Sequence, residues 1–199
     1  MAISEYHQKY AGLSDKEIAN RMKVRELELF EIFKKVILMT GNSLVNVAVT
    51  GCGDKRFIKL HQQMFEKVLK KKVKIISFDI SIEHLKGEKN VIRHDCCRPL
   101  PNQPYDLIYA HVVLKFNNRD KQWQIIKNSY DALQFGGIAI HIINREDYST
   151  REEKLANGYY SVPVQHWKKQ IAKEGIKFIE LPLNYQDMGF EGVALVLMK

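Results

Sequence analysis

The chain has 199 residues and a formal net charge of +8, with 45% hydrophobic and 27% charged residues. This length fits one domain, residues 1–199, with a sizeable core, and the composition is that of an ordinary soluble globular protein. No apolar run approaches the length of a membrane span, so we expect no membrane partner. The positive charge is compatible with binding to nucleic acid or another anion.

The N-terminal stretch MAISEYHQKYAGLSDKE lacks the apolar core that a signal peptide needs, which predicts a cytoplasmic location. The three cysteines, Cys52, Cys96 and Cys97, do not form the pattern of a disulfide framework. Cys96 and Cys97 are adjacent, but no CxxC motif or matching Cys/His set accompanies them. We therefore expect reduced thiols and no metal site.

Residues 1–40 are expected to form an N-terminal helical segment. The sequence SDKE at Ser14–Glu17 has the form of a capping box, in which serine and glutamate side chains satisfy backbone N–H groups. Apolar residues then follow at the spacing of one helix face, at Ile18, Met22, Leu29, Phe33, Val36 and Ile37. This pattern predicts a helix that ends near Gly41.

Residues 45–199 alternate between strand and helix patterns. The expected strands are Val45–Thr50, Val73–Asp79, Val91–His94, Tyr105–His111 and Ile138–Ile143. The expected helices are Asp54–Lys71, a short one at Ser81–Gly87, and Asp120–Leu133, which Gly136 and Gly137 are expected to stop. Such alternation predicts a doubly wound α/β core, Rossmann-like, with a mostly parallel sheet and helices on both faces.

The C-terminal part departs from this alternation. Pro163 is expected to start a helix that Gly175 ends. Two strands follow with no helix between them, Ile176–Leu183 and Gly192–Lys199. A short connection between consecutive strands predicts an antiparallel pair at the C-terminus.

A dense basic run, KVLKKKVK, covers Lys67–Lys74. It falls at the far end of the expected helix 54–71, where lysine side chains complement the negative end of the helix dipole. We interpret it as a solvated helix end, and a nucleic-acid contact is the alternative.

The stretch VNVAVTGCGDKRFIKL, residues 45–60, is a strand that runs into a glycine turn and then a helix. In a parallel sheet, ligands bind outside the carboxyl ends of the strands, and Gly51 and Gly53 would let the backbone approach one. The dinucleotide fingerprint GxGxxG is incomplete, because Arg56 stands at its third glycine. A nicotinamide cofactor is therefore disfavoured, and the GxxxxGK[ST] loop of nucleotide triphosphatases is absent.

Two further acids close neighbouring strands of the predicted sheet. Asp79 ends the second strand, where a carboxylate can accept hydrogen bonds from both hydroxyls of a ribose. Asp95 ends the third strand and could receive the amino group of an adenine. The alternative is that Asp79 caps the following turn and Asp95 is a loop residue. Because the acids and the glycine turn occur in order along one sheet edge, we favour the ligand interpretation.

With these residues in order, the chain resembles the class I S-adenosylmethionine-dependent methyltransferases from roughly Val45 to the C-terminus. VAVTGCGD looks like the family's first motif, SFDIS like its second, and RHDCCRPLPNQPYDLIYAHVVLKF like its third and fourth. YDALQFGGIAIHII is similar to the family's helix, glycine turn and fifth strand. The resemblance implies an enzyme with S-adenosylmethionine as its cofactor.

The resemblance also implies roles for individual residues, from the methionine part of the cofactor to the adenine and then to the sulfonium and substrate. The implied cofactor contacts, in chain order, are Thr50, Gly51, Cys52, Gly53, Asp79, Ile80, Asp95, Cys96, Ala110 and His111. Within this set Asp79 would bind the ribose and Ile80 would pack on the adenine. His111 is the candidate catalytic base, and the alternative is that it only lines the pocket.

The sequence departs from the family pattern at two positions. The family usually has an acid two residues before its first glycine, where this chain has Val49, and often a third glycine, where it has Lys55. A non-catalytic binding or scaffolding protein with the methyltransferase fold therefore stays open as an alternative. His141, which lies inside an apolar strand, is interpreted as a core histidine with its hydrogen bonds satisfied.

The methyl acceptor is not identified by any motif. The stretch AHVVLKF after the fourth strand lacks the Asp/Asn/Ser-Pro-Pro-aromatic motif of enzymes that methylate amino groups of bases, and it lacks the cysteine needed for cytosine C5. Small molecules, protein side chains and other RNAs remain as acceptors. Five tyrosines are candidates for a substrate pocket or for ordinary packing: Tyr6, Tyr10, Tyr148, Tyr159 and Tyr160.

Overall fold

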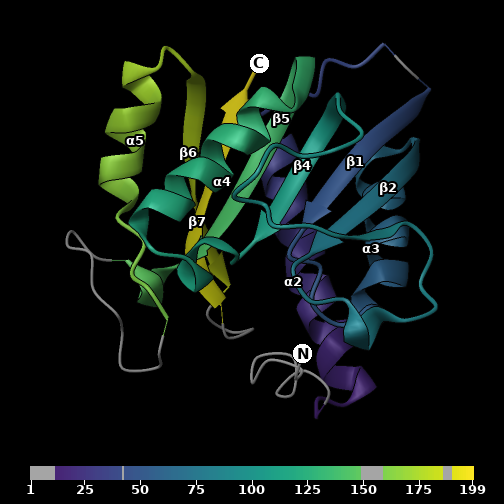
Figure 1. Cartoon of the computed structure of the whole chain (residues 1–199). Helices are drawn as coiled ribbons and strands as arrows, with labels where there is room; N and C mark the ends of the chain where they lie inside the picture. The colour runs from purple at the N-terminus through teal and green to yellow at the C-terminus, as the bar shows by residue number, and fades with distance from the viewer. Residues whose placement is uncertain (1–11, 42, 149–158, 186–189) are drawn as a thin grey trace.

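The computed structural model describes residues 12–41, 43–148, 159–185 and 190–199. Within these ranges the strands form a seven-stranded sheet in the order β3-β2-β1-β4-β5-β7-β6 (Figure 1). The strands are β1 (Leu44–Thr50), β2 (Lys72–Asp79), β3 (Val91–Arg93), β4 (Tyr105–His111), β5 (Leu133–Asn144), β6 (Lys177–Tyr185) and β7 (Phe190–Met198). The first five pair in parallel, whereas β7 is antiparallel to β5 and to β6. The expected mostly parallel sheet with a C-terminal antiparallel pair is confirmed.

Helices cover both faces of the sheet, as the alternation predicts. The longer helices are α2 (Asp15–Phe33), α3 (Lys55–Leu69), α4 (Arg119–Asp131) and α5 (Val164–Lys173). Apolar residues of α2 and α3 share one buried cluster with Val47, Val49 and Leu107 of the sheet. Those of α4 and α5 share a second cluster with Ala48 and Ile108. Since strand side chains alternate between faces, β1 and β4 contribute buried side chains to both clusters. Within the described ranges, no helix is long and apolar enough to cross a membrane.

The N-terminal helix starts as predicted but ends earlier. The capping box is present, since Glu17 N donates to Ser14 Oγ at 3.3 Å and Ser14 N donates to Glu17 Oε2 at 2.7 Å. The helix ends at Phe33, so the expectation that it reaches Gly41 is wrong. The chain after it bonds to the sheet instead, because Met39 N donates to Gly136 O at 3.2 Å.

The two glycines expected to stop the third long helix lie inside a strand. Helix α4 ends at Asp131, and β5 is continuous from Leu133. The pairing of β5 with β4 shifts register in this stretch, which marks a β-bulge. Gly136 has φ 80°, and a Cβ there would lie 2.6 Å from Met39 O. The glycines therefore serve the bulge and the close passage of residues 36–40, which local sequence does not reveal.

The basic run spans the end of α3 and the start of β2. Lys70 caps α3 in the left-handed conformation, with φ 52°, and β2 begins at Lys72. The run therefore lies where the parallel strands begin, and the glycine turn lies where β1 ends. The predicted placement of Lys67–Lys74 away from the glycine turn is confirmed.

Candidate functional site

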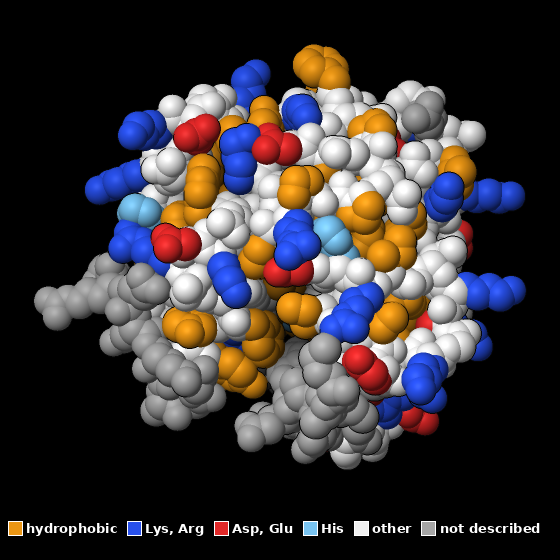
Figure 2. Space-filling view, viewed as in Figure 1, with side chains coloured by type: hydrophobic (Ala, Val, Ile, Leu, Met, Phe, Trp, Pro, Cys, Tyr) orange, Lys and Arg blue, Asp and Glu red, His pale blue; other side chains and the backbone are white. Residues whose placement is uncertain are grey.

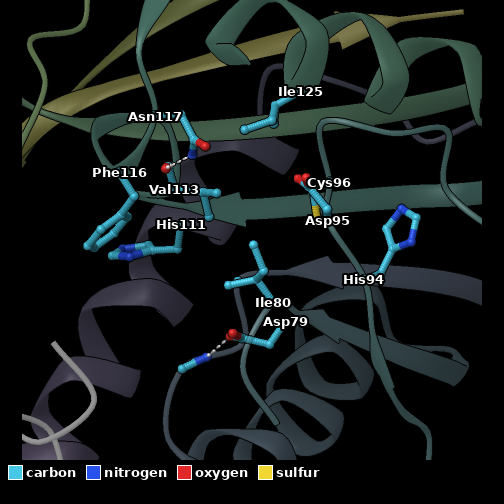
Figure 3. A pocket seen from close by; sticks show the side chains of 12 residues that line it. Asp79, Ile80, His94, Asp95, Cys96, His111, Val113, Phe116, Asn117 and Ile125 are labelled. Carbon is cyan, nitrogen blue, oxygen red and sulfur yellow. Dashed lines mark hydrogen bonds between the residues drawn. The ribbon is translucent and has the colours of Figure 1, made fainter. Parts of the chain in front are cut away.

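A pocket of about 270 Å³ opens at the carboxyl ends of β1, β2 and β4. It is lined by Gly51, Gly53, Asp79, Ile80, His94, Asp95, Cys96, His111, Val113, Phe116, Asn117 and Ile125. Figure 3 shows Asp79 and Ile80 on one wall, Asp95 and Cys96 on another, and His111 with Phe116 on a third. Most of the lining is apolar, and the few polar groups converge from separate loops, as is usual for small-molecule sites.

The glycine turn forms one side of the pocket. Gly51 and Gly53 both have positive φ, 65° and 72°, a conformation that side chains with a Cβ rarely adopt. A Cβ on Gly51 would lie 2.8 Å from Val113 Cγ2, so this glycine lets the loop after β4 approach the turn. A Cβ on Gly53 would meet only the Phe57 ring, at 3.7 Å. The requirement for glycine is thus steric at Gly51 and mainly conformational at Gly53.

Arg56, at the third glycine position of the dinucleotide fingerprint, ties two helix starts together. Its Nε donates to Asp54 Oδ1 at 2.9 Å, and its guanidinium lies 3.1 Å from the Asp15 carboxylate. Asp54 also caps α3, accepting from Arg56 N at 2.8 Å. Arg56 therefore joins the starts of α2 and α3 and does not line the pocket.

Asp79 holds the glycine turn and the loop after β2 in place. Its Oδ2 accepts from Gly53 N at 3.2 Å, and its Oδ1 accepts from Ser81 N at 3.1 Å. The residue is buried, yet it borders the pocket. The bond to Ser81 is the turn-capping contact that the sequence offered as an alternative. A carboxylate has about four acceptor positions, so this contact is compatible with further donors from a ligand.

The adjacent wall combines an exposed apolar side chain with a fixed carboxylate. Ile80 is 62% exposed although it lies beside the buried Asp79. Asp95 Oδ1 accepts from Cys97 N at 3.0 Å, and this bond holds the pKa of Asp95 below its usual range. Burial raises the pKa of the Cys96 thiol to about 12, so this cysteine is a neutral lining group.

The structure brings seven of the ten expected cofactor residues to the pocket and leaves Thr50, Cys52 and Ala110 out of its lining. Thr50 and Ala110 pair across β1 and β4, and both are buried. Cys52 is also buried, with Sγ 3.9 Å from Asp79 Oδ2, and burial raises the pKa of its thiol. These three residues support the turn and β4 from behind.

A buried polar cluster backs the pocket at His111. We call it the α2 polar cluster, and it comprises Arg25 and Glu28 of α2, His61 of α3, and Tyr109 and His111 of β4. His111 Nε2 lies 3.3 Å from Glu28 Oε2, and Arg25 Nη1 lies 3.0 Å from His61 Nε2. The Tyr109 ring makes an edge contact with His61, with centroids 6.2 Å apart. Side chains from three elements thus meet behind one residue of the pocket.

Several atoms of this cluster have no aligned hydrogen-bond partner in the described part of the chain. They include both carboxylate oxygens of Glu28, the hydroxyl of Tyr109 and Nε2 of His111. Burial, with a smaller effect of Arg25, lowers the pKa of His111 despite the opposing charge of Glu28. The imidazole is therefore neutral near pH 7 and is able to accept a proton. Buried polar atoms left unpaired are unusual in folded proteins, and a titratable group with a shifted pKa in a cleft is a candidate functional residue.

The sequence contains a signal for this cluster within the apolar stripe of α2. Arg25 falls between Met22 and Leu29 at the spacing of the apolar stripe of α2, where a charged residue is unexpected. Its guanidinium lies 4.2 Å from the centre of the Phe57 ring, which a cation–π contact explains. Glu28 also falls at stripe spacing, four residues before the buried Ile32, but no local pattern links it to its partner His111 on a distant strand.

The loop after His111 is strained. Val112 has φ 60°, which is an outlier for a β-branched residue. The conformation is held by the bond from Val112 N to Ile142 O, 2.9 Å long. Such strain is concentrated at functional sites, and here it directs the chain from His111 into the pocket wall at Val113 and Phe116.

His141 and the tyrosines differ in part from expectation. His141 is buried as predicted, but neither ring nitrogen has a hydrogen-bond partner among the described residues, so the expectation of a satisfied histidine is wrong. Burial lowers its pKa to about 4. Tyr148, Tyr159 and Tyr160 do not line the pocket, although the Tyr159 ring packs against Phe116 at a centroid distance of 5.0 Å. Tyr6 and Tyr10 lie outside the described residues.

All three cysteines are free thiols. In the described ranges, no group of three or more His, Cys, Asp or Glu side chains could hold a metal ion.

No protein-family model and no curated protein sequence matches the chain. Solved structures do match it. A SAM-dependent methyltransferase from Leishmania major superposes with a TM-score of 0.63 at 13% identity, covering 90% of this chain and 72% of that one. A TehB-like SAM-dependent methyltransferase from Corynebacterium glutamicum gives 0.57 at 15% identity, covering 87% and 86%. LepI in complex with SAM gives 0.58 at 12% identity, and this chain spans only 46% of its length.

These superpositions establish a common architecture, and at such low identities the activity of this chain must be argued from its own residues. Strand order, the antiparallel C-terminal pair and the position of the pocket all agree with the resemblance inferred from the motifs. The chain therefore has the Rossmann-like fold of the class I S-adenosylmethionine-dependent methyltransferases.

Proposed function

We propose that this protein transfers a methyl group from S-adenosylmethionine to a nucleophilic nitrogen or oxygen atom of an acceptor molecule. The observation that carries the proposal is the placement of Asp79 and His111 on separate walls of one pocket, with Asp79 held by backbone N–H groups of Gly53 and Ser81 and His111 backed by the buried Glu28. Asp79 suits the cofactor's ribose, and His111 suits the acceptor.

The wall around Asp79 fits the adenosine part of the cofactor. The Asp79 carboxylate is fixed by two backbone N–H groups and can accept from ribose hydroxyls. Ile80 is exposed toward the pocket and offers an apolar surface to the face of an adenine ring. Asp95 and Cys96 would meet the adenine edge, with the Asp95 carboxylate ionised because of its lowered pKa.

The turn at Gly51 and Gly53 would face the methionine part of the cofactor. Both glycines line the pocket, and a Cβ on Gly53 would have no contact closer than 3.7 Å with the protein. The backbone at Gly53 therefore faces space that a ligand can occupy. Thr50, Cys52 and Ala110 would act from behind this surface.

When bound, S-adenosylmethionine supplies a methyl group on a positively charged sulfur. Direct displacement from such a sulfonium needs alignment of the acceptor and exclusion of water. His111, neutral because of its lowered pKa, would accept the proton that the acceptor loses. Glu28, whose Oε2 lies 3.3 Å from His111 Nε2, would position the ring and stabilise the imidazolium that forms.

A non-catalytic protein with this fold is the second candidate. Val49 is only 2% exposed and occupies the position at which the methyltransferases usually have an acid. One solved structure with the same fold is described as a pericyclic reaction enzyme, so the fold also supports other chemistry. In this second interpretation the pocket binds a ligand without methyl transfer.

Isothermal titration with S-adenosylmethionine and with NAD, followed by assays with labelled S-adenosylmethionine and panels of acceptors, separates the candidates. We expect S-adenosylmethionine to bind and NAD not to bind, with label transferred to at least one acceptor class. Binding of NAD without S-adenosylmethionine would overturn the proposal. Binding of S-adenosylmethionine without transfer to small molecules, peptides or RNA would favour the non-catalytic candidate.

A further inference from the structure

The exposed apolar side chains of this protein gather at two places. Six large apolar residues are exposed within the described ranges, and two of them, Ile80 and Phe116, line the pocket. The other four lie where the parallel strands begin: Ile37, Met39, Leu44 and Phe135. We call this region the amino edge and define it as residues 34–41, 43–44, 70–72, 134–136 and 199. Figure 2 shows a hydrophobic side chain standing out at the top of the molecule, with Lys and Arg side chains nearby.

Hydrogen bonds join the segments of the amino edge. Met39 N donates to Gly136 O at 3.2 Å, which places Met39 beside Phe135. Lys71 Nζ donates to Thr40 O at 3.1 Å, and Leu44 pairs with Lys72 at the start of the sheet. The four apolar residues and the basic run therefore belong to one surface, although they come from three separate parts of the chain.

The backbone of two segments, residues 36–39 and the bulge of β5, directs these apolar side chains outward. In residues 36–39 buried and exposed positions alternate, with Val36 4% exposed, Ile37 82% and Met39 66%. Phe135 lies in the bulge of β5 and is 86% exposed. An exposed phenylalanine next to two exposed aliphatic residues is costly to leave in water, and such patches mark interaction sites.

The charge of the amino edge is of one sign. It contains six exposed lysines and no Asp or Glu: Lys34, Lys35, Lys70, Lys71, Lys72 and Lys199. Of the two acids next to it, Asp131 lies 2.5 Å from Lys127, outside the edge, and Glu31 lies 2.5 Å from Lys34, so the net positive charge of the edge rests on the other five lysines. A partner for this surface must therefore be anionic and must accept apolar side chains.

We propose that the amino edge docks on the surface of an anionic lipid membrane. Lysines near such a surface are attracted by its negative potential, while Ile37, Met39 and Phe135 enter the boundary between headgroups and acyl chains. A second copy of the chain fits less well, because a symmetric contact would bring the lysines of both copies together. RNA fits less well because Ile37 and Met39 can neither stack on bases nor donate to phosphates.

The contact is peripheral, and it revises the expectation of no membrane partner, which rested on the lack of a long apolar run. It also gives Lys70, Lys71 and Lys72, the middle of the basic run, a role beyond a solvated helix end. The proposal does not depend on the methyl-transfer proposal, since the two surfaces share no residue.

Co-sedimentation with phosphatidylcholine vesicles, with and without phosphatidylserine, tests the proposal. We expect binding only with phosphatidylserine present, and weaker binding at high salt. Replacing Lys70, Lys71 and Lys72 by Gln should weaken binding about a hundredfold, at about tenfold per one and a half lysines. A matched control replaces three exposed lysines elsewhere, Lys16, Lys23 and Lys59, and should weaken binding less than about threefold.

The double variant Met39→Ser/Phe135→Ser tests the apolar contribution, and we expect about tenfold weaker binding at low salt with an unchanged melting temperature, because both side chains are largely exposed. Equal losses in the two lysine triples, or no binding to phosphatidylserine vesicles, would overturn the proposal. Binding of an RNA probe that only the Lys70–Lys72 triple abolishes, without vesicle binding, would assign the surface to nucleic acid. A dimer in sedimentation velocity that Phe135→Ser disperses would assign it to a second copy.

Discussion

The two ends of the parallel strands in this protein are built in opposite ways. At the carboxyl ends, the pocket is concave and mostly apolar, and its buried carboxylates, Asp79 and Glu28, lie in it or behind it. At the amino edge, the surface carries lysines and protruding apolar side chains. β1 separates the two by six residue steps, roughly 20 Å at about 3.3 Å per step.

Because the two ends are built so differently, one sheet can carry two surfaces with independent energetics. The pocket depends on Asp79, which hydrogen bonds from neighbouring loops fix, and on His111, which lies 3.3 Å from the Glu28 carboxylate of α2. The amino edge depends on exposure and net charge, which involve few contacts within the fold. Substitutions at one end should therefore leave the other unchanged.

The largest effect is expected for His111. His111→Ala should lower the rate of methyl transfer by about 10²–10⁴-fold, the usual contribution of a general base, at nearly constant cofactor affinity. The measurements are label transfer to the acceptor found by screening and titration with S-adenosylmethionine. If turnover survives, His111 only lines the pocket.

Glu28→Gln separates positioning from catalysis at the same site. Because the charge of Glu28 raises the pKa of His111 against the effect of burial, its removal should lower that pKa further. The acid limb of the rate profile should then move to lower pH, which a purely structural role would not produce. Glu28→Ala is the comparison for stability, since it removes the carboxylate together with its packing.

The next largest effect is a loss of stability at low pH. It comes from His141, which is buried in the core between the pocket and the amino edge. Burial lowers the pKa of His141 to about 4, below the ordinary value of 6.5. The unfolded chain therefore binds a proton first as pH falls, so stability is full above about pH 6.5 and is lost down to about pH 4. The pKa values of His61 and His111 are lowered too, so they act in the same direction.

From pH 7 to pH 5, His141 alone should cost about 2 kcal/mol of unfolding free energy, at about 1.36 kcal/mol per pKa unit. His141→Leu removes the buried ring nitrogens at similar volume and should reduce the difference by about that amount. Urea unfolding at the two pH values measures it. An unchanged difference in His141→Leu would mean that the imidazole does not stay neutral in the folded protein.

Substitution of Asp79 is expected to weaken the binding of S-adenosylmethionine. Asp79→Ala should weaken S-adenosylmethionine binding by about ten- to a hundredfold, because a hydrogen bond to a charged group contributes roughly 1.5–3 kcal/mol. It should also lower the melting temperature of the ligand-free protein, because Gly53 N and Ser81 N lose their acceptor. Asp79→Asn keeps an acceptor oxygen and should lose less of both. A lowered melting temperature with unchanged affinity in both variants would leave Asp79 with the capping role alone.

The fold could be predicted from the sequence because its signals are local. Alternation of strand and helix patterns and the box at Ser14 depend on residues close in the chain, and the structure reproduces them. The errors arose where distant segments decide. Gly136 serves a bulge beside Met39, and the helix expected to reach Gly41 ends at Phe33 because the following residues bond to β5.

In the candidate site, too, local sequence patterns predicted some residues, whereas others depend on contacts between distant segments. Gly51, Gly53 and Asp79 lie at strand ends that the sequence marks, and the pocket contains all three. Glu28 became visible only when α2 was packed against β4, since no local pattern links residue 28 to His111. His141 was correctly placed in the core, but whether its nitrogens found partners depended on neighbouring strands and helices.

The smallest effect on cofactor affinity is expected for lysines of the basic run. An unchanged affinity in this variant supports the separation of the two ends of the sheet. Replacing Lys70, Lys71 and Lys72 by Gln changes the formal charge from +8 to +5. The lysines begin about 20 Å from the pocket along the strands, whereas exposed charges are screened within about 8 Å at physiological ionic strength. Titration should therefore show S-adenosylmethionine affinity within about twofold of the parent protein, even where vesicle binding falls about a hundredfold. A matching loss of cofactor affinity at physiological salt, with the melting temperature unchanged, would mean that the two ends of the sheet are coupled through the fold. In that case the separation between a binding pocket and a docking edge would be wrong, and the loss should then persist at high salt, because coupling through packing is not screened.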